Sequence, residues 1–334
     1  MPIRIADVAK KAGVCITTVS RVLNNHTQVR QANREKVLQA IKELGYNPNA
    51  AARALSKGTN ETLGVVIRTL NDPYWADLVE RIEQAALDNG YLVVLAVVND
   101  KDFNMEKRWA RIFSEGRTDG MILVSPQKEA DYLMDLKESD FPVVLVDNNR
   151  GDWDLPSVVV DNVEGGRLAT RHLLDLGHTR IAHIVGRTEY SAARDRLEGY
   201  RAAYEEVGVA VPEDLVGYGN YDFQEAQRIT TEWLSLRERP TAIFAFDDVM
   251  AMAVMNAARS LGVGIPEELS LVGFDDSPVC DWLLPPLTSV RQPAEAMAEQ
   301  AVSTVLRYIK NRPPRQKVCV VSPRLTVRQS TRRL

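Results

Sequence analysis

Hydrophobic positions in the first 45 residues recur with the period of a helix in three short segments. The first segment carries an apolar stripe at i, i+3, i+4 and i+7, made by Ile5, Val8, Ala9 and Ala12. The inward positions of the second, residues 16–24, are Val19, Val22 and Leu23, and those of the third are Val37, Leu38, Ile41 and Leu44. Gly45 ends the third segment, because glycine readily takes the left-handed conformation that closes a helix. The spacing therefore predicts a small three-helix domain.

From residue 62 the pattern changes to alternating strands and helices. The predicted strands span residues 63–67, 91–98, 121–124, 143–146, 158–160, 181–185, 242–246 and 270–274. The predicted helices follow Pro73 and span residues 104–115, 171–176, 192–207 and 249–261. Repeated strand–helix units predict parallel, doubly wound sheets. Two such runs predict two similar α/β lobes joined by crossing segments, with a ligand cleft beyond the carboxyl ends of the strands.

The stretch between the two patterns is typical of a linker. Its alanine-rich part, residues 50–55, is too short to hold a helix unaided and has little apolar surface to bury. We therefore expect a helix-turn-helix domain over residues 1–47, a hinge over 48–60 and a body over 61–334. Within the body, the N-lobe takes about residues 61–160 and 291–322, and the C-lobe about 161–290 and 323–334.

The charge is distributed unevenly along the 334 residues. The formal net charge is −4, yet residues 1–60 hold ten Lys/Arg against three Asp/Glu, a balance of +7, which leaves −11 for the remainder. A basic head on an acidic body indicates a small polyanion-binding module.

The lengths of the apolar runs and the placement of the cysteines indicate where the protein acts and whether it binds a metal. The longest apolar run, residues 91–98, is far shorter than the roughly 20 residues that cross a bilayer, and the start lacks a secretory apolar region. Cys15, Cys280 and Cys319 are too scattered for a disulfide framework or a zinc site. We expect a cytoplasmic protein without membrane contact, metal or cofactor.

The segment from Ala9 to Leu23 has the helix, glycine turn and second helix of a helix-turn-helix, whose second helix reads bases in the major groove. If Val19 and Val22 face inward, then the outward side chains are Ile16, Thr17 and Arg21. Arginine can donate two bonds to a guanine edge, and the methyl groups of isoleucine and threonine can contact thymine. The side chains better suited to phosphates are Thr18, Ser20, Asn24 and Asn25. The alternative is a structural three-helix unit whose Arg21 is merely solvated.

Motifs of enzymes are missing from the sequence. It contains no G-x-G-x-x-G after a strand, no P-loop and no G-x-S-x-G, and its four histidines show no ligand spacing. We expect no catalytic residues. A solute-binding protein or an enzyme on the same two lobes is the alternative, against which the basic head and the missing leader both count.

A set of short motifs, in order and over essentially the whole chain, resembles the LacI/GalR family of bacterial repressors. The motifs are Ile5-Ala6-Asp7-Val8-Ala9, Ala12-Gly13-Val14, Thr18-Val19-Ser20-Arg21-Val22, Leu44-Gly45-Tyr46-Asn47-Pro48-Asn49, Asp161-Asn162, Gly165-Gly166, Leu176-Gly177-His178-Thr179-Arg180-Ile181-Ala182, Arg194-x-Arg196-x-x-Gly199-Tyr200, Val272-Gly273-Phe274-Asp275-Asp276 and Pro286-Leu287-Thr288. Each motif is modest alone, but their common order is specific.

The resemblance implies a homodimer that binds near-palindromic operator DNA and a periplasmic-binding-protein-like body that takes a small effector. It implies a hinge helix that forms on DNA and inserts Leu55, supported by Ala52, into the minor groove, with Tyr46 as a further DNA contact. An apolar wedge of this kind kinks the duplex at a cost of a few kcal/mol per step. A passive tether is the alternative for this segment.

The resemblance also implies a set of effector contacts, which are Tyr74, Trp75, Asp147, Arg196, Tyr221, Asp247 and Asp275. Aromatic faces would cover the apolar side of a pyranose, while the carboxylates and the arginine bind its hydroxyls. The alternatives are that Tyr74 and Trp75 belong to the core and that Arg196 and Asp275 form a structural ion pair.

Three departures from the family pattern limit these expectations. Cys15 replaces the usual serine and is a poor helix cap, and Arg30 and Asn33 replace the serine and threonine at the start of the third helix. Asp247 replaces a frequent asparagine and adds negative charge to the cleft. No leucine heptad tail follows residue 330, so a tetramer built by such a tail is not expected.

Together these expectations describe a repressor of carbohydrate-utilisation genes that a sugar or sugar derivative releases from its operator. The alternative is a repressor that requires a corepressor, either a nucleobase or a partner protein.

Overall fold

The computed structural model describes residues 3–23, 26–47, 58–98, 103–126, 132–147 and 154–334. The chain forms two compact units, Met1–Glu61 and Thr62–Leu334, which are considered one at a time below. None of the helices in the described residues is both long and apolar enough to cross a membrane.

In its described residues, the first unit contains three helices. Its helices are α1 (Ile5–Ala12), α2 (Ile16–Leu23) and α3 (Gln31–Leu44). Glycines with left-handed backbone close α1 and α3, Gly13 at φ 66° and Gly45 at φ 61°. The core is made by side chains from all three helices, namely Val8, Ala9, Ala12, Val19, Val22, Val37 and Ala40.

The inward face of α3 differs from the prediction at one position. Leu38 was expected in the core but is 52% exposed, and Ala40 is buried in its place. The buried and half-buried positions Val37, Ala40, Ile41 and Leu44 follow i, i+3, i+4 and i+7, and Leu38 falls about 100° away from Val37 on the helix. The helical period thus excludes Leu38 from the core although it is apolar.

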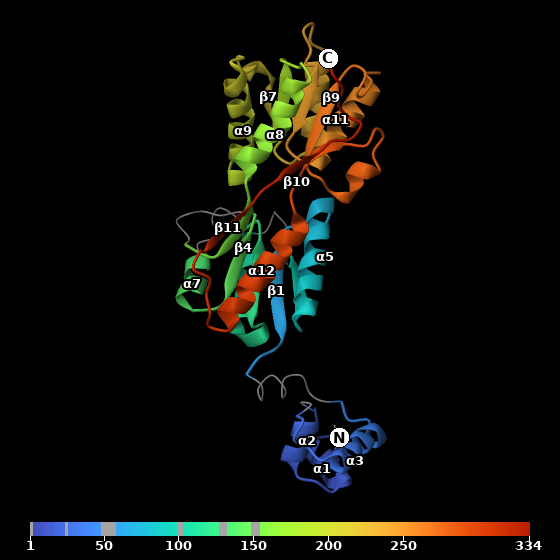
Figure 1. Ribbon diagram of the computed structural model, residues 1–334, viewed down its shortest axis with the longest axis vertical. Coiled ribbons are helices and arrows are strands. Elements are labelled where there is room, and N and C mark those ends of the chain that lie inside the picture. Colours follow the sequence, from blue (N-terminus) through green and yellow to red (C-terminus); the bar gives the residue numbers. More distant parts are fainter. Residues whose placement is uncertain (1–2, 24–25, 48–57, 99–102, 127–131, 148–153) are drawn as a thin grey trace. The chain divides into compact units, whose positions relative to one another are not determined.

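The second unit is built on two six-stranded sheets, which Figure 1 shows as separate lobes. The strands of the N-lobe sheet, in spatial order, are β11 (Val318–Val321), β5 (Ser157–Val160), β4 (Val143–Val146), β3 (Gly120–Val124), β1 (Thr62–Ile67) and β2 (Leu92–Val97). Those of the C-lobe sheet are β12 (Arg324–Thr326), β10 (Thr288–Arg291), β9 (Ser270–Asp275), β8 (Ala242–Ala245), β6 (Ile181–Val185) and β7 (Val216–Tyr218). The chain passes between the sheets after β5, after β10 and after β11.

Helices cover both faces of the N-lobe sheet. One face carries α5 (Pro73–Asp88) and α12 (Ala294–Ile309), and the other carries α6 (Phe103–Ile112), the π-helical turn η1 (Phe113–Arg117) and α7 (Tyr132–Glu138). Alternate residues of β1 serve the two faces, because side chains alternate along a strand: Val65 packs toward α5 and α12, and Val66 toward Phe113.

The C-lobe sheet is covered in the same way. Its helices are α8 (Asn162–Asp175), α9 (Ser191–Val207), α10 (Phe223–Leu234) and α11 (Asp248–Ser260), with 3-10 turns η2 (Glu213–Leu215) and η3 (Pro278–Asp281). Neighbouring residues of β9 face opposite helices, Phe274 toward Gly165 of α8 and Gly273 toward Asp248 of α11. Helices α8 and α9 approach so closely that a Cβ on Gly199 would lie 2.0 Å from the Val163 carbonyl oxygen. This contact fixes the middle of α9 against α8, one turn beyond Arg196.

The predicted fold class is confirmed, with differences in detail. Strand β12 pairs antiparallel with β10, so the C-lobe sheet is not entirely parallel. Helix α8 begins at Asn162, well before the predicted residue 171, because its first turns bury the small residues Gly165 and Gly166 rather than large apolar ones. The pattern also missed α7, β7 and α10. Strand β7 has only three residues, too few for a recognisable alternation.

Candidate functional site

The second helix of the first unit presents the side chains that the sequence assigned to base reading. Val19 and Val22 of α2 are buried, whereas Ile16, Thr17 and Arg21 are exposed. Ile16 is 49% exposed, which is unusual for isoleucine at a helix start with an apolar core available nearby. The outer face of α2 therefore carries one cation and two methyl-bearing side chains.

The remaining residues assigned to DNA contact are distributed differently. Thr18 and Ser20 are half-buried at the edge of that face, and Tyr46 is half-buried against the domain core. Asn24, Asn25, Ala52 and Leu55 lie outside the described residues.

Cys15 stands where α2 begins, and its carbonyl oxygen accepts the N–H groups of Thr18 and Val19. The exposed Sγ lies 3.0 Å from the hydroxyl oxygens of both Thr17 and Thr18. These hydrogen bonds lower the pKa of the thiol to about 7. Helix α2 thus begins at a polarised thiol in place of a serine.

A cavity of about 210 Å³ lies between the two lobes of the second unit, at the carboxyl ends of the strands. The N-lobe supplies Ile67, Arg68, Thr69, Asn71, Asp72, Trp75, Val124 and Ser125, and the C-lobe supplies Tyr221, Asp247, Val249 and Met250. Three of the expected effector contacts, Trp75, Tyr221 and Asp247, are therefore brought together here. Tyr221 also packs edge-on against Phe246, with ring centroids 4.9 Å apart.

Tyr74 does not line this cavity. It is 2% exposed, its hydroxyl donates to Met297 Sδ of α12 at 3.5 Å, and it belongs to the N-lobe core. Its ring contacts Trp75 edge-on at 4.9 Å between centroids. Tyr74 therefore belongs to the core, as the alternative interpretation had it, and packs against the ring of Trp75.

Arg196 does not line the cavity and is held by contacts from several directions. Its Nε donates to Asn162 Oδ1 at 2.9 Å, and its Nη1 donates to the Phe246 carbonyl oxygen at 2.6 Å. Its guanidinium lies 3.5 Å from the centroid of the Phe274 ring and 4.3 Å from that of Phe246. Nη2 lies 3.8 Å from Asp275 Oδ1, so Arg196 and Asp275 form a long ion pair. Both residues are buried.

Four aspartates near this arginine, Asp72, Asp147, Asp247 and Asp275, have raised pKa values. Burial is the main cause for Asp72, Asp147 and Asp275, whose pKa values lie above the usual range despite the attraction of Arg196. Burial, followed by the charge of Asp72, raises the pKa of Asp247 to about 7. Asp248 is different, because it accepts hydrogen bonds from Ser277 and from Ser289 and so ties α11 to the neighbouring loop.

The backbone around the cleft is strained at non-glycine residues. Positive φ angles occur at Asp147 (72°), directly after β4, at Asp275 (106°), the last residue of β9, and at Tyr221 (59°) in the loop that follows β7. Such conformations cost of order 1–3 kcal/mol each and persist where surrounding contacts impose them, often at binding sites.

Several polar residues of the cleft were not among the predicted effector contacts, namely Arg68, Thr69, Asn71, Asp72, Ser125 and Tyr190. Arg68 donates to the Tyr190 hydroxyl at 2.5 Å and to Ser125 Oγ at 3.4 Å, which joins the N-lobe to the C-lobe. Each follows or lies near the carboxyl end of a parallel strand, the position where ligand contacts gather in such sheets. That rule was the available signal.

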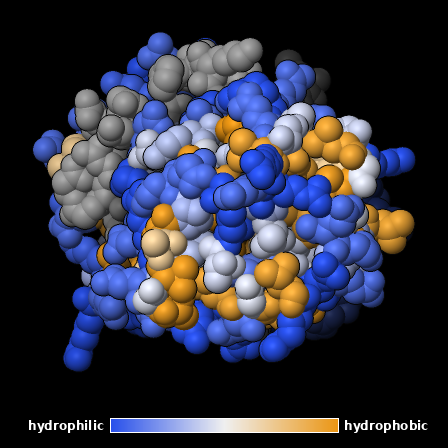
Figure 2. Space-filling view, turned by 90° about the horizontal axis from the view of Figure 1, so that it is seen from above, coloured by the Kyte–Doolittle hydropathy of each residue, from blue (hydrophilic) through white to orange (hydrophobic). Residues whose placement is uncertain are grey.

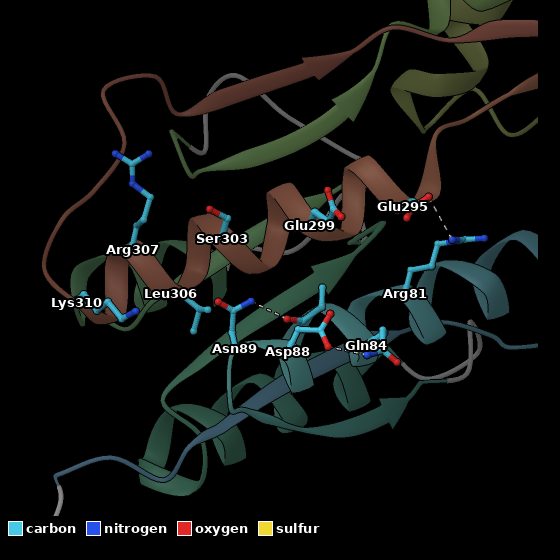
Figure 3. A pocket seen from close by; sticks show the side chains of 11 residues that line it. Arg81, Gln84, Asp88, Asn89, Glu295, Glu299, Ser303, Leu306, Arg307 and Lys310 are labelled. Atoms are coloured by element: carbon cyan, nitrogen blue, oxygen red, sulfur yellow. Dashed lines mark hydrogen bonds and ion pairs between the residues drawn. The ribbon is translucent and has the colours of Figure 1, made fainter.

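A second hollow, of about 530 Å³, is lined by residues of α5 and α12 (Figure 3). Its wall carries both positive and negative side chains. Arg81 forms an ion pair with Asp77 at 2.8 Å and a longer one with Glu295 at 3.7 Å, the second of which Figure 3 shows. Exposed charges that satisfy each other give little binding energy. This groove is a weaker candidate than the interlobe cavity.

Apolar side chains are also exposed at two places on the second unit, and Figure 2 shows hydrophobic patches within a largely hydrophilic surface. Edge strand β2 exposes Leu92 (65%), Val94 and Val97. In the C-lobe, Trp282 (78%) and Leu284 (91%) border a groove of about 620 Å³ beside α11. Contiguous exposed apolar surface is typical of protein–protein contacts.

Comparison with known proteins places these features in context. Residues 4–49 match the family model described as bacterial regulatory proteins, lacI family, and residues 170–331 match the periplasmic binding protein-like domain. The HTH-type transcriptional repressor PurR of Photobacterium profundum is 32% identical over 99% of each chain.

Two solved structures resemble the whole chain. The transcriptional regulator CelR in complex with cellobiose is 32% identical, with a TM-score of 0.75 over 98% of this chain and 99% of that one. The lac repressor dimer bound to operator and the anti-inducer ONPF is 26% identical, with a TM-score of 0.89 over 99% and 100% of the two chains.

Proposed function

Because this chain belongs to the LacI family of bacterial regulatory proteins, we propose that it is a homodimeric repressor of carbohydrate-utilisation genes, released from its operator by a small sugar. The chain is a DNA-binding transcriptional repressor and not an enzyme. It would act in the cytoplasm, where its operator lies. The observation that carries the sugar proposal is the interlobe cavity lined by Trp75, Tyr221 and Asp247.

The outer face of α2 would read each half of a near-palindromic operator. Arg21 would make a bidentate bond to guanine, with Ile16 and Thr17 against thymine methyl groups. A single head makes few base contacts, so two heads related by two-fold symmetry are needed for a specific site. The exposed positions of these three side chains support this assignment.

A test of base reading replaces Arg21 with alanine. We expect discrimination at one base pair in each half-site to fall by about 1–3 kcal/mol, because a bidentate contact is lost. Operator fragments selected from a random library and their single-base variants, assayed by fluorescence anisotropy, provide the measurement. Arg237→Ala removes an exposed arginine of the body and serves as the control. Unchanged discrimination in Arg21→Ala would show that another residue reads the bases.

A second copy of this chain would cover the exposed apolar surface of β2 and the groove beside Trp282. The lac repressor, which shares this fold along its full length, was solved as a dimer on operator DNA. Both apolar surfaces belong to the same compact unit, one in each lobe. A dimer contact that includes both lobes would be sensitive to a change in the lobe arrangement.

The effector would act by favouring one arrangement of the lobes. A ligand shifts such an equilibrium only through its difference in affinity for the two states. The cavity is bounded by residues of both lobes, and Arg68 bonds across them to Tyr190, so a ligand there senses their separation. The solved CelR–cellobiose complex supports a sugar as the ligand class.

The decisive experiment measures operator affinity with and without candidate sugars. An inducing sugar should weaken operator binding and stabilise the protein against heat, by about 2.7 kcal/mol at 100 times its dissociation constant. If no sugar alters operator affinity or thermal stability, the proposed effector class is wrong.

A corepressor-dependent repressor is the second candidate. The aromatic rings of Trp75 and Tyr221, together with carboxylates that accept N–H groups, would also suit a flat nucleobase. The PurR relative is as similar in sequence as CelR, at 32% identity each, so identity does not decide between the two. A nucleobase that strengthens operator binding would favour this candidate.

A further inference from the structure

Two carboxylates line the interlobe cavity from opposite lobes. Asp72 caps α5 by accepting the Tyr74 N–H at 2.9 Å, and Asp247 caps α11 by accepting the Met250 N–H at 2.6 Å. Both line the same cavity, and the charge of Asp72 raises the pKa of Asp247. The helix caps fix their positions, so neither carboxylate can rotate away without uncapping a helix.

The cleft has few cations free to neutralise them. Arg196 is committed to Asn162 and to the Phe246 carbonyl, and aromatic rings cover its guanidinium. Arg68 donates to Tyr190 and Ser125 and lies over the Tyr190 ring at 4.5 Å. In the parts of the chain that the structure describes, none of the ion pairs within 4.0 Å involves Asp72 or Asp247.

Burial raises the pKa of both carboxylates, and the charge of Asp72 raises the pKa of Asp247 further, so the charged form of each is disfavoured. A neutral ligand would expel water from the cavity and leave the repulsion in place. A ligand with a positive charge would remove it, because a buried charge is tolerated when it is paired and hydrogen-bonded.

The rest of the lining suits an organic cation of modest size. Trp75 and Tyr221 offer aromatic faces, which attract an ammonium group and also cover the apolar side of a sugar ring. Asn71, Thr69 and Ser125 add neutral groups that can bond hydroxyls. A volume of about 210 Å³ favours a ligand of monosaccharide size.

We infer that the effector is a compact hydroxylated amine of the amino-sugar class, whose ammonium group binds between Asp72 and Asp247. This inference rests on the proposed effector function of the cleft and narrows its ligand class. Each carboxylate keeps one role in the protein, as a helix cap, and gains a second role in charge recognition.

The test compares matched ligands on the full-length protein at pH 7. The amines are D-glucosamine, D-galactosamine and D-mannosamine, and their neutral partners are the parent hexoses and the N-acetyl derivatives. Binding is followed by thermal shift and by release of fluorescent operator DNA. We expect at least one amine to bind about 30-fold more tightly than its neutral partners, the effect of one desolvated charge pair.

The variant Asp247→Asn keeps a capping oxygen and removes the charge. It should abolish the preference for the amine while operator binding persists. Asp72→Asn repeats the test from the other lobe if Asp247→Asn does not fold. Asp222→Asn is the matched control, because Asp222 caps α10 in the same way but is exposed and does not line the cavity.

The outcomes separate this inference from the proposed function. A neutral hexose that releases the operator as well as its amine, or an amine preference that survives in both Asp247→Asn and Asp72→Asn, overturns the inference and leaves the repressor function intact. If none of the amines binds, the inference is also overturned. If neither amines nor neutral sugars affect operator binding, sugar control fails together with it.

Discussion

The environment of Asp247 in the folded protein disfavours its charged form. Its side chain is 5% exposed, and Asp72 and Asp248 add negative charge that Arg196 only partly offsets. The folded-state pKa is about 7, against about 3.9 in an unfolded chain. Since the folded form binds the proton more tightly, the cost of this residue is full above pH 7 and disappears as the pH falls toward 4.

The variant Asp247→Asn should therefore stabilise the effector-free protein at pH 8, by about 1–3 kcal/mol, and change its stability little at pH 4. Urea unfolding monitored by fluorescence between pH 4 and pH 8 would measure both effects. A stability difference that grows as the pH falls would contradict the direction of the pKa shift.

Cys15 gives the head a titratable group next to the residues assigned to base reading. Hydrogen bonds from Thr17 and Thr18 lower its pKa to about 7, whereas burial raises the pKa of Cys280. Because the thiolate is the reactive form, alkylation of Cys15 by iodoacetamide should be half-maximal near pH 7, and Cys280 should react only on unfolding.

Peptide-resolved mass spectrometry would measure the labelling of each cysteine. Selected operator DNA should protect Cys15, which neighbours Ile16 and Thr17, and leave other labelled sites unaffected. Equal labelling of Cys15 with and without operator would argue against a DNA contact at the start of α2.

At the scale of elements, the two edges of the N-lobe sheet provide a matched comparison. Strands β2 and β11 are both edge strands, and each exposes a valine, Val94 on β2 and Val320 on β11. On β2 the exposed valine shares its face of the sheet with the exposed Leu92, and Val97 is exposed on the other face. This difference is the reason for assigning the dimer contact to the β2 edge.

We expect Val94→Lys to weaken the dimer by about tenfold or more, because lysine on an edge opposes pairing and would bury a charge in the contact. Val320→Lys, the same change on the opposite edge, should leave the dimer intact. Sedimentation velocity across a range of protein concentrations measures both. Dissociation of both variants, or of Val320→Lys alone, would place the contact elsewhere.

Helix starts are the other recurring device at this scale. Asp72, Asp161, Asp222 and Asp247 all cap helices of the body with a side-chain oxygen. Capping alone accounts for an aspartate at each position. Two of the four caps also lie at the cleft, where the same residue type can contact a ligand.

At the scale of the whole molecule, Gln292 connects the cleft to a segment that passes between the lobes. It follows β10, donates from Nε2 to Asp275 Oδ1 at 2.6 Å, and its backbone N–H bonds the Asp275 carbonyl oxygen at 3.2 Å. Asp275 in turn contacts Arg196. A ligand that pulled on Asp275 would act directly on the chain between the lobes.

The variant Asp275→Asn should keep operator affinity and lose most of the response to effector, because it retains the bond from Gln292 but not the charge near Arg196. Operator titrations with and without the inducing ligand measure the response. Asp214→Asn, which alters a surface ion pair with Arg180, is the control. A normal response in Asp275→Asn would remove Asp275 from the effector site.

Local spacing predicted most of the elements because each helix or strand repeats its burial pattern over a few residues. The eight strands predicted from the pattern lie within one residue of their observed bounds, and the family assignment from ordered motifs is confirmed by the comparisons. The pattern was wrong at Leu38 and missed α7, β7 and α10. A strand of three residues, such as β7, is too short to show an alternating pattern. Adjacent apolar residues such as Val37 and Leu38 do not by themselves show which of the two faces the core.

The amino-acid sequence by itself determined the helical head, its excess of positive charge, the doubly wound body and the residue types available at the strand ends. Only the tertiary structure decided that Tyr74 packs into the core while Trp75 lines the cavity, and that Asp72 and Asp247 line that cavity from different lobes. The reason is physical, because periodicity shows only which face of its own helix or strand a residue lies on. The charge and pKa of a site depend on groups that the fold brings together from distant parts of the chain.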